Sequence, residues 1–110
     1  MVYKTTYISG VVTAGAVDVE VAQFSCPKGM KRIVREVRPY SSVNTNVVIS
    51  LFLESDQVFN IAIEPHLTYN LPYVADWEIV EGARLRLIGS NTGGTDATII
   101  VVLTYEESKA

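Results

Sequence analysis

In the stretch Val17-Asp18-Val19-Glu20-Val21-Ala22-Gln23-Phe24, apolar side chains at 17, 19 and 21 alternate with two acids. Successive side chains of a β-strand point to opposite faces of a sheet, so this period of two indicates a strand with one buried and one wet face. Helical periodicity is nearly absent from the rest of the chain. The sequence therefore predicts an all-β protein.

Elsewhere in the chain, further runs rich in β-branched and aromatic residues are separated by turn residues such as Pro27-Lys28-Gly29 and Glu81-Gly82. The expected strands are residues 3–12, 17–24, 30–37, 47–53, 58–63, 77–80, 83–88 and 97–105. About eight short strands with regular turn signals are typical of an antiparallel, two-sheet β-sandwich with a jelly-roll-like arrangement. The irregular connection 64–76 is long enough to cross from one sheet to the other.

The length and composition of the chain predict one domain over residues 1–110, because 48% of its 110 residues are apolar and 19% are charged. Residues 1–12 are expected as an N-terminal arm or strand, and residues 106–110 as a flexible tail. A net charge of −3 gives no general attraction for nucleic acid or anionic lipid. We find no signal peptide and no apolar run long enough to cross a membrane, and expect a cytoplasmic protein or one that leaves the cell by lysis or another route that the sequence does not reveal.

Residues with catalytic or metal-binding chemistry are few. His66 is the single histidine, and Glu64 is the nearest candidate for a second ligand, whereas closed zinc sites take four ligands. Cys26 is the single cysteine and is interpreted as a structural thiol, because a nucleophilic thiol also needs a positioned base. We therefore expect no enzyme, no catalytic residues, no cofactor and no metal.

A basic cluster comes after the first turn and consists of Lys28, Lys31, Arg32, Arg35 and Arg38. Alternation along a strand predicts Arg32 and Arg38 on one face and Lys31 and Arg35 on the other. A phosphate-binding stripe would place the charges on one face. The split favours ion pairs across the sheet or a subunit contact over nucleic-acid binding.

Three aromatic residues, Tyr69, Tyr73 and Trp77, form a possible ligand-binding group. Exposed rings on a β-sandwich can stack on sugar faces, which supports an alternative function as a carbohydrate- or ligand-binding module. The competing interpretation is that the rings fill one end of the sandwich. We favour packing and keep ligand binding as the alternative.

Two runs, Val47–Leu53 and Ile99–Leu103, are apolar at nearly every position. Such runs indicate strands covered on both faces, and a two-layer domain has nothing of its own to cover the outer face. Another copy of the chain is the simplest cover, so we expect a homo-oligomer. The alternatives are a folded-over N-terminal arm (residues 1–12) and a permanent partner of another kind. The expected interface residues are Val48, Phe52, Ile100 and Val102.

Two further stretches are Phe24-Ser25-Cys26-Pro27-Lys28-Gly29 before a strand, and Trp77–Leu87 followed by Asn91-Thr92 and a closing apolar strand. In both, the chain resembles small single jelly-roll proteins of viruses and phages. The resemblance implies a capsid, decoration or fibre-head part, often trimeric, that belongs to a larger protein assembly. The expected function is that of a non-catalytic structural or assembly protein, and the resemblance implies a decoration-type virion accessory.

Overall fold

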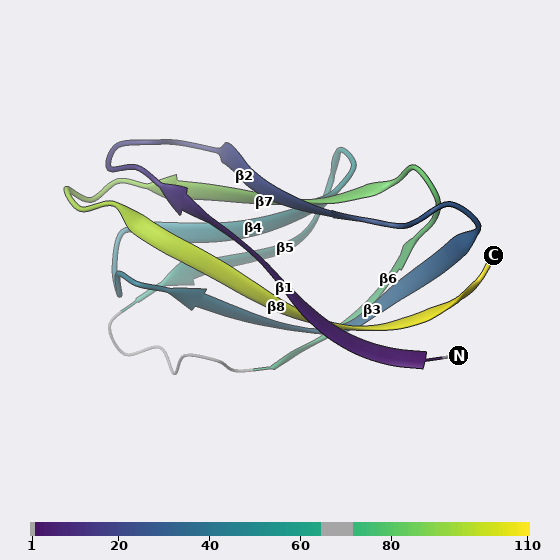
Figure 1. Ribbon diagram of the computed structural model, residues 1–110. Helices are drawn as coiled ribbons and strands as arrows, with labels where there is room; N and C mark the ends of the chain where they lie inside the picture. Colours follow the sequence, from purple (N-terminus) through teal and green to yellow (C-terminus); the bar gives the residue numbers. More distant parts are fainter. Residues whose placement is uncertain (1, 65–71) are drawn as a thin grey trace.

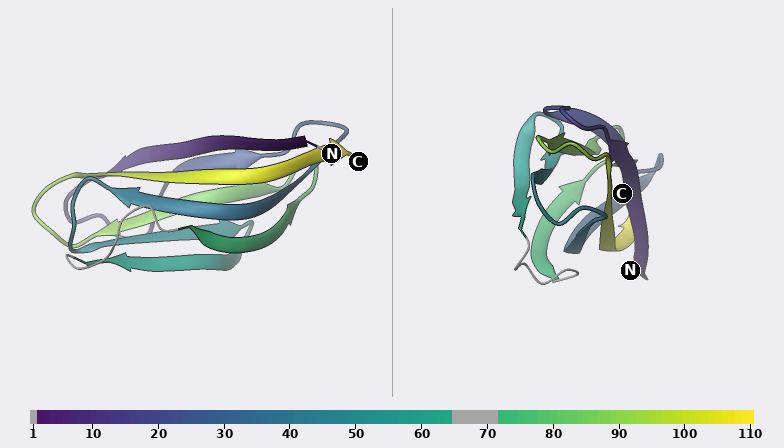
Figure 2. Two further views of the ribbon diagram at one scale, coloured as in Figure 1. Left: turned by 90° about the horizontal axis from the view of Figure 1, so that it is seen from below. Right: turned by 90° about the vertical axis from the view of Figure 1, so that its left-hand side faces the viewer.

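The computed structural model describes residues 2–64 and 72–110 as a sandwich of eight β-strands (Figure 1). The strands are β1 (Val2–Val12), β2 (Val19–Ser25), β3 (Met30–Ser41), β4 (Val47–Leu53), β5 (Asp56–Ile63), β6 (Tyr73–Ile79), β7 (Arg84–Asn91) and β8 (Ala97–Lys109). They form two antiparallel four-stranded sheets that pack face to face (Figure 2). The predicted all-β, two-sheet fold is confirmed. The part of the chain described here contains no helix that could span a membrane.

The strand order is β1-β8-β3-β6 in the first sheet and β2-β7-β4-β5 in the second sheet. The pairs β1–β8, β2–β7, β3–β6 and β4–β5 are nested, like the two arms of one long hairpin folded over. The pairs β3–β8 and β4–β7 then join these four strand pairs into two sheets. This nested order is that of an eight-stranded jelly roll. The connection between β5 and β6 passes from one sheet to the other, as expected.

The core lies between the sheets and is built from alternate residues of the central strands. In β8 the inward side chains from Ala97 to Tyr105 are buried at every second position. Fully buried large side chains from the other strands include Val34, Val37, Ile49, Leu51, Ile79, Leu85 and Leu87. Both chain termini lie at one end of the sandwich (Figure 1), because Val2 pairs with Glu107.

One long side of the sandwich is closed by a near contact between β1 and β2. A Cβ atom added to Gly10 would lie 2.5 Å from the Cβ of Val21, which real Cβ atoms do not do. Gly10 is therefore the residue that lets these two strands, which belong to different sheets, approach each other.

Several strand boundaries differ from those expected from the sequence, and β3 continues through Pro39 to Ser41 instead of ending at residue 37. The expected flexible tail at 106–110 is wrong, because β8 continues to Lys109 and pairs with β1 and β3. β6 begins at Tyr73, four residues before the predicted start at Trp77. β2 begins at Val19, two residues after the predicted start, and has an irregular register between Glu20 and Ala22. Val17 lies before the strand and is 64% exposed, so the first apolar residue of the alternating stretch is not buried.

Candidate functional site

The outer face of the first sheet, which points away from the core, carries exposed apolar and aromatic side chains. Tyr3 and Tyr7 are each 66% exposed on β1, Val11 is 53% exposed, and Val74 on β6 is 95% exposed. The residues that alternate with Tyr7 and Val11, namely Ile8 and Val12, are buried in the core. The exposed rings and methyl groups of β1 therefore belong to the outer face.

The register of the first sheet brings side chains from three strands together on this face. Tyr7 pairs with Val102, which pairs with Arg38. In the next row, Ser9 pairs with Ile100, and Ile100 pairs with Tyr40. Ile100 and Val102 are partly exposed, in contrast to the inward residues of β8. Together Tyr7, Val11, Tyr40, Ile100 and Val102 form a surface that we call the outer apolar patch.

A charged group lies on the same face toward the chain termini. Arg35 donates to Glu106 of β8 and to Asp76 of β6. Glu106 is only 5% exposed. The Arg35 guanidinium, with a hydrogen bond from Tyr3, lowers the pKa of the Glu106 carboxyl below its ordinary value despite burial. This carboxylate is ionised and paired at neutral pH, so it has no features of a catalytic acid.

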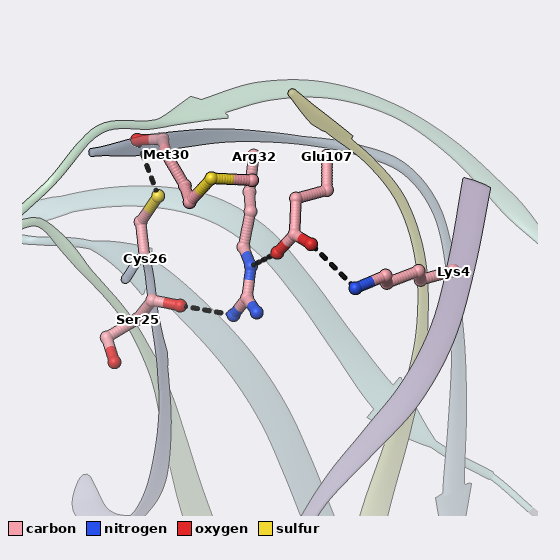
Figure 3. A network of polar contacts seen from close by, with 6 residues as sticks. All are labelled: Lys4, Ser25, Cys26, Met30, Arg32 and Glu107. Atoms are coloured by element: carbon pink, nitrogen blue, oxygen red, sulfur yellow. Dashed lines mark hydrogen bonds and ion pairs between the residues drawn. The ribbon is translucent and has the colours of Figure 1, made fainter. Parts of the chain in front are cut away.

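A second polar network closes the end of the core between the sheets (Figure 3). Glu107 accepts from Arg32 Nε at 2.8 Å and from Lys4 Nζ at 2.6 Å, and Arg32 also donates to the carbonyl of Ser25. The Arg32 guanidinium lies 4.8 Å from the ring centroid of Phe24, a cation–π contact. These bonds stabilise the charges of Lys4 and Arg32 at the end of the sandwich, where the core would otherwise be in contact with water.

The predicted division of the basic cluster between two faces is wrong for Arg38. A register irregularity between Val34 and Glu36 shifts the alternation of β3 at Arg35. As a result Arg35 and Arg38 lie on the outer face, whereas Arg32 points to the core side. The expected ion pairs are present, since Arg38 pairs with Glu36 in addition to the pairs of Arg32 and Arg35 described above.

The four predicted interface residues do not form one surface. Ile100 and Val102 belong to the outer apolar patch on the first sheet. Val48 and Phe52 lie on β4, on the outer face of the second sheet, where Val48 pairs with Ser90 and Ala62. Strand order decides this separation, and the apolar pattern of the two runs contains no information on strand order.

The structure describes two of the three aromatic residues that were predicted to bind a ligand. Tyr69 lies outside the described residues, as does His66. Tyr73 and Trp77 are half-buried and share the inward face of β6. Their ring centroids lie 5.3 and 6.5 Å from that of Phe59 on β5. The three rings thus fill the space between two edge strands, and packing accounts for the position of both predicted residues.

Cys26 is buried, and its thiol lies 3.0 Å from the carbonyl oxygen of Met30 as a hydrogen-bond donor (Figure 3). Burial raises the pKa of this thiol, which disfavours the reactive thiolate. Within residues 2–64 and 72–110, no three His, Cys, Asp or Glu side chains are grouped so that they could hold a metal ion.

Tyr3, Tyr7, Val11 and Val74 are the surface residues that sequence reasoning missed. The signal lay in β1, where residues 3, 7 and 11 share one face. That face could not be identified as the outer one, because Ile8 and Val12 make the opposite face equally apolar. Comparison with known proteins finds no matching family model and no matching curated sequence.

Proposed function

We propose that the protein is a non-catalytic structural protein whose copies associate through the outer face of the first sheet. The observation that carries this proposal is the exposure of Tyr7 and Val11 on a face whose central strand β8 also presents Ile100 and Val102. Soluble monomers rarely leave large contiguous apolar patches in water. A second copy would remove this patch from solvent.

The composition of the face suits a protein interface. Interfaces are enriched in Tyr and Arg, and this face holds Tyr3, Tyr7, Tyr40, Arg35 and Arg38. Arg35 and Arg38 are already held by carboxylates of the same chain. The patch could therefore be covered without leaving these cations unpaired, and the same ion pairs argue against phosphate binding.

A closed assembly is better explained by contacts through the first sheet alone than by contacts that use the outer faces of both sheets. The outer faces of the two sheets lie on opposite sides of the sandwich (Figure 2). A contact between the first sheet of one copy and the second sheet of the next closes only if the rotation between copies generates a ring, and faces that point in opposite directions favour a filament instead. We therefore assign Ile100 and Val102 to the contact between copies, and exclude Val48 and Phe52 from it.

The finer proposal is a decoration-type accessory component of a virion, assembled as a trimer with its patches around the three-fold axis. It is supported by the resemblance of the sequence to small viral jelly-roll proteins and by the occurrence of jelly rolls in viral capsids. A fold by itself does not determine function, so the trimer and the virion remain proposals.

The alternative function is a carbohydrate- or ligand-binding module that uses Tyr69, Tyr73 and Trp77. The contact of Phe59 with Tyr73 and Trp77 explains those two rings without a ligand. Binding of a sugar that is lost in Trp77→Ala, with the fold intact, would favour this alternative over the assembly function.

Two matched variants test the assigned surface. Ile100→Asp places a charge on the outer face of a central strand of the first sheet, and Val48→Asp does the same on the second sheet. Sedimentation velocity should show that Ile100→Asp reduces the assembly to monomers while Val48→Asp leaves it assembled. Dissociation by Val48→Asp alone would contradict the proposal.

A further inference from the structure

The outer face of the second sheet contains two shallow hollows that the assembly contact does not use. The first, of about 280 Å³, is lined by Asp18, Phe52, Gln57, Arg86 and Ile88. The second, of about 260 Å³, is lined by residues of β4, β5 and β7, such as Val48, Ala62 and Ser90, and by residues that flank these strands, such as Glu64 and Thr92. The two hollows follow one another along β7, because Arg86, Ile88 and Ser90 lie on the same face of that strand.

A pair of hydrogen bonds connects the two hollows. Asp18 lines the first hollow and Ser90 the second, and the backbone N–H of Asp18 donates to Ser90 Oγ at 2.8 Å. Ser90 Oγ in turn donates to Asp18 Oδ1 at 3.1 Å. The hollows are therefore adjacent, with the Asp18–Ser90 bonds at the boundary between them, and we call the two together the trough. From Arg86 to Thr92 this trough runs about 20 Å, at about 3.3 Å per strand residue.

The lining combines an aromatic ring, an arginine that is held in place and a glutamine whose amide has no side-chain partner among the described residues. Arg86 is fixed by its ion pair with Glu20 and by a hydrogen bond to the carbonyl of Glu54. Phe52 supplies the ring. Gln57 makes no side-chain hydrogen bond to the described residues, so its amide can both donate to and accept from a ligand. Groups that are already ordered lose little entropy on binding.

From this trough we propose a binding site for a linear, uncharged oligosaccharide. Compact ligands occupy pockets of about 300–1,000 Å³, and each hollow is smaller than that range. An extended ligand that spans both hollows fits better than a compact one. The ring of Phe52 would pack on a sugar face, and Gln57, Asp18 and Thr92 would bind hydroxyl groups.

The surroundings disfavour an anionic ligand and a peptide. Arg86 is the one cation in the first hollow and is already paired with Glu20, while Asp18 adds a negative charge. Extended peptides bind sheets mainly by adding a strand to an edge, where free backbone groups are available. The trough lies on the face of the sheet and offers side chains, which suit the hydroxyls of a sugar.

The test is an NMR titration of the isotope-labelled full chain with maltotetraose, cellotetraose, xylotetraose, mannotetraose and chitotetraose at millimolar concentration. We expect at least one of them to shift the amide signals of Phe52, Gln57, Arg86 and Ser90. Gln57→Ala should weaken this binding about tenfold, the loss of a hydrogen bond to the ligand. Gln23→Ala is the matched control, since Gln23 faces the same side of the second sheet but lines neither hollow.

Three outcomes would overturn the proposal. They are the absence of shifts with all five sugars, equal weakening by Gln57→Ala and Gln23→Ala, and shifts centred on Tyr73 and Trp77 instead of the trough. None of these outcomes bears on association through the first sheet, because the two faces are separate and the oligomeric mass is measured without sugar.

Discussion

Arg35 donates from its Nε to Oε2 of Glu106, and this bond joins a residue at a β3 irregularity to a carboxylate that is almost fully covered on the outer face of β8. A buried carboxylate without a partner is costly, because it loses its hydration and gains nothing in return. The shift of register at Arg35 places the guanidinium where it can also reach Asp76 on the other neighbouring strand. Arg35 thereby connects three of the four strands of the first sheet.

Replacing Arg35 with Met should lower the stability of the protein clearly, because Glu106 would lose its cation while staying covered. The measurement is the urea midpoint of unfolding at neutral pH. Arg84→Met is the control, since Arg84 and Glu54 form a longer, more exposed ion pair at 3.6 Å. Equal midpoints for the two variants would contradict the role given to Arg35.

Acid should destabilise the fold. Hydrogen bonds from Lys4 and Arg32 lower the pKa of Glu107, and those from Arg35 and Tyr3 lower that of Glu106, in both cases below the ordinary 4.5. A lowered folded-state pKa adds stability that is complete above the ordinary value and is lost as the pH falls through the folded-state value. The free energy of unfolding should therefore decrease below about pH 4.5. Glu107→Gln should make that decrease smaller, and an unchanged pH profile in this variant would count against the network.

The thiol of Cys26 should not react in the folded protein. It is buried, donates to Met30, and has a pKa raised by burial, so little thiolate is available. Ellman's reagent should label the chain slowly under native conditions and rapidly after unfolding in guanidinium chloride. Fast labelling of the native protein would show that the thiol is open to solvent.

Gly89→Ala should destabilise the core. An added Cβ would lie 2.4 Å from Cγ2 of Val12 and 3.0 Å from Cδ1 of Ile99, so the neighbouring side chains would have to move. Such overpacking costs about 1–3 kcal/mol of unfolding free energy. Gly94→Ala is the control, because nothing lies within 4 Å of its added Cβ. Urea denaturation that shows Gly89→Ala to be as stable as Gly94→Ala would contradict this packing.

The strands could be predicted because alternation and turn residues are local properties of the chain. Val47–Leu53 is one predicted strand with the bounds that the structure shows. Irregularities in register were not predictable in this way, because they depend on the partner strand. The irregularity at Arg35 therefore places Arg38 on the opposite face from Arg32, although the two residues are an even number of positions apart and alternation predicts one shared face.

Only part of the candidate surface was predictable from the sequence. Ile100 and Val102 were identified because β8 is apolar at positions that face both ways. Val48 and Phe52 carry the same signal, but the nested order of the strands places β4 in the other sheet. Tyr7 and Val11 were not predicted as surface residues, because both faces of β1 are apolar and only the paired structure shows which face is covered.

Association between copies is tested by measuring the mass of the unmodified protein in solution. Multi-angle light scattering at low micromolar concentration should give a multiple of the 12.1 kDa chain mass, with three copies as the proposed number. Association at this concentration is expected because the outer apolar patch is removed from water only between copies. A particle of 12.1 kDa would contradict the account, since the patch would then be stably exposed on a monomer.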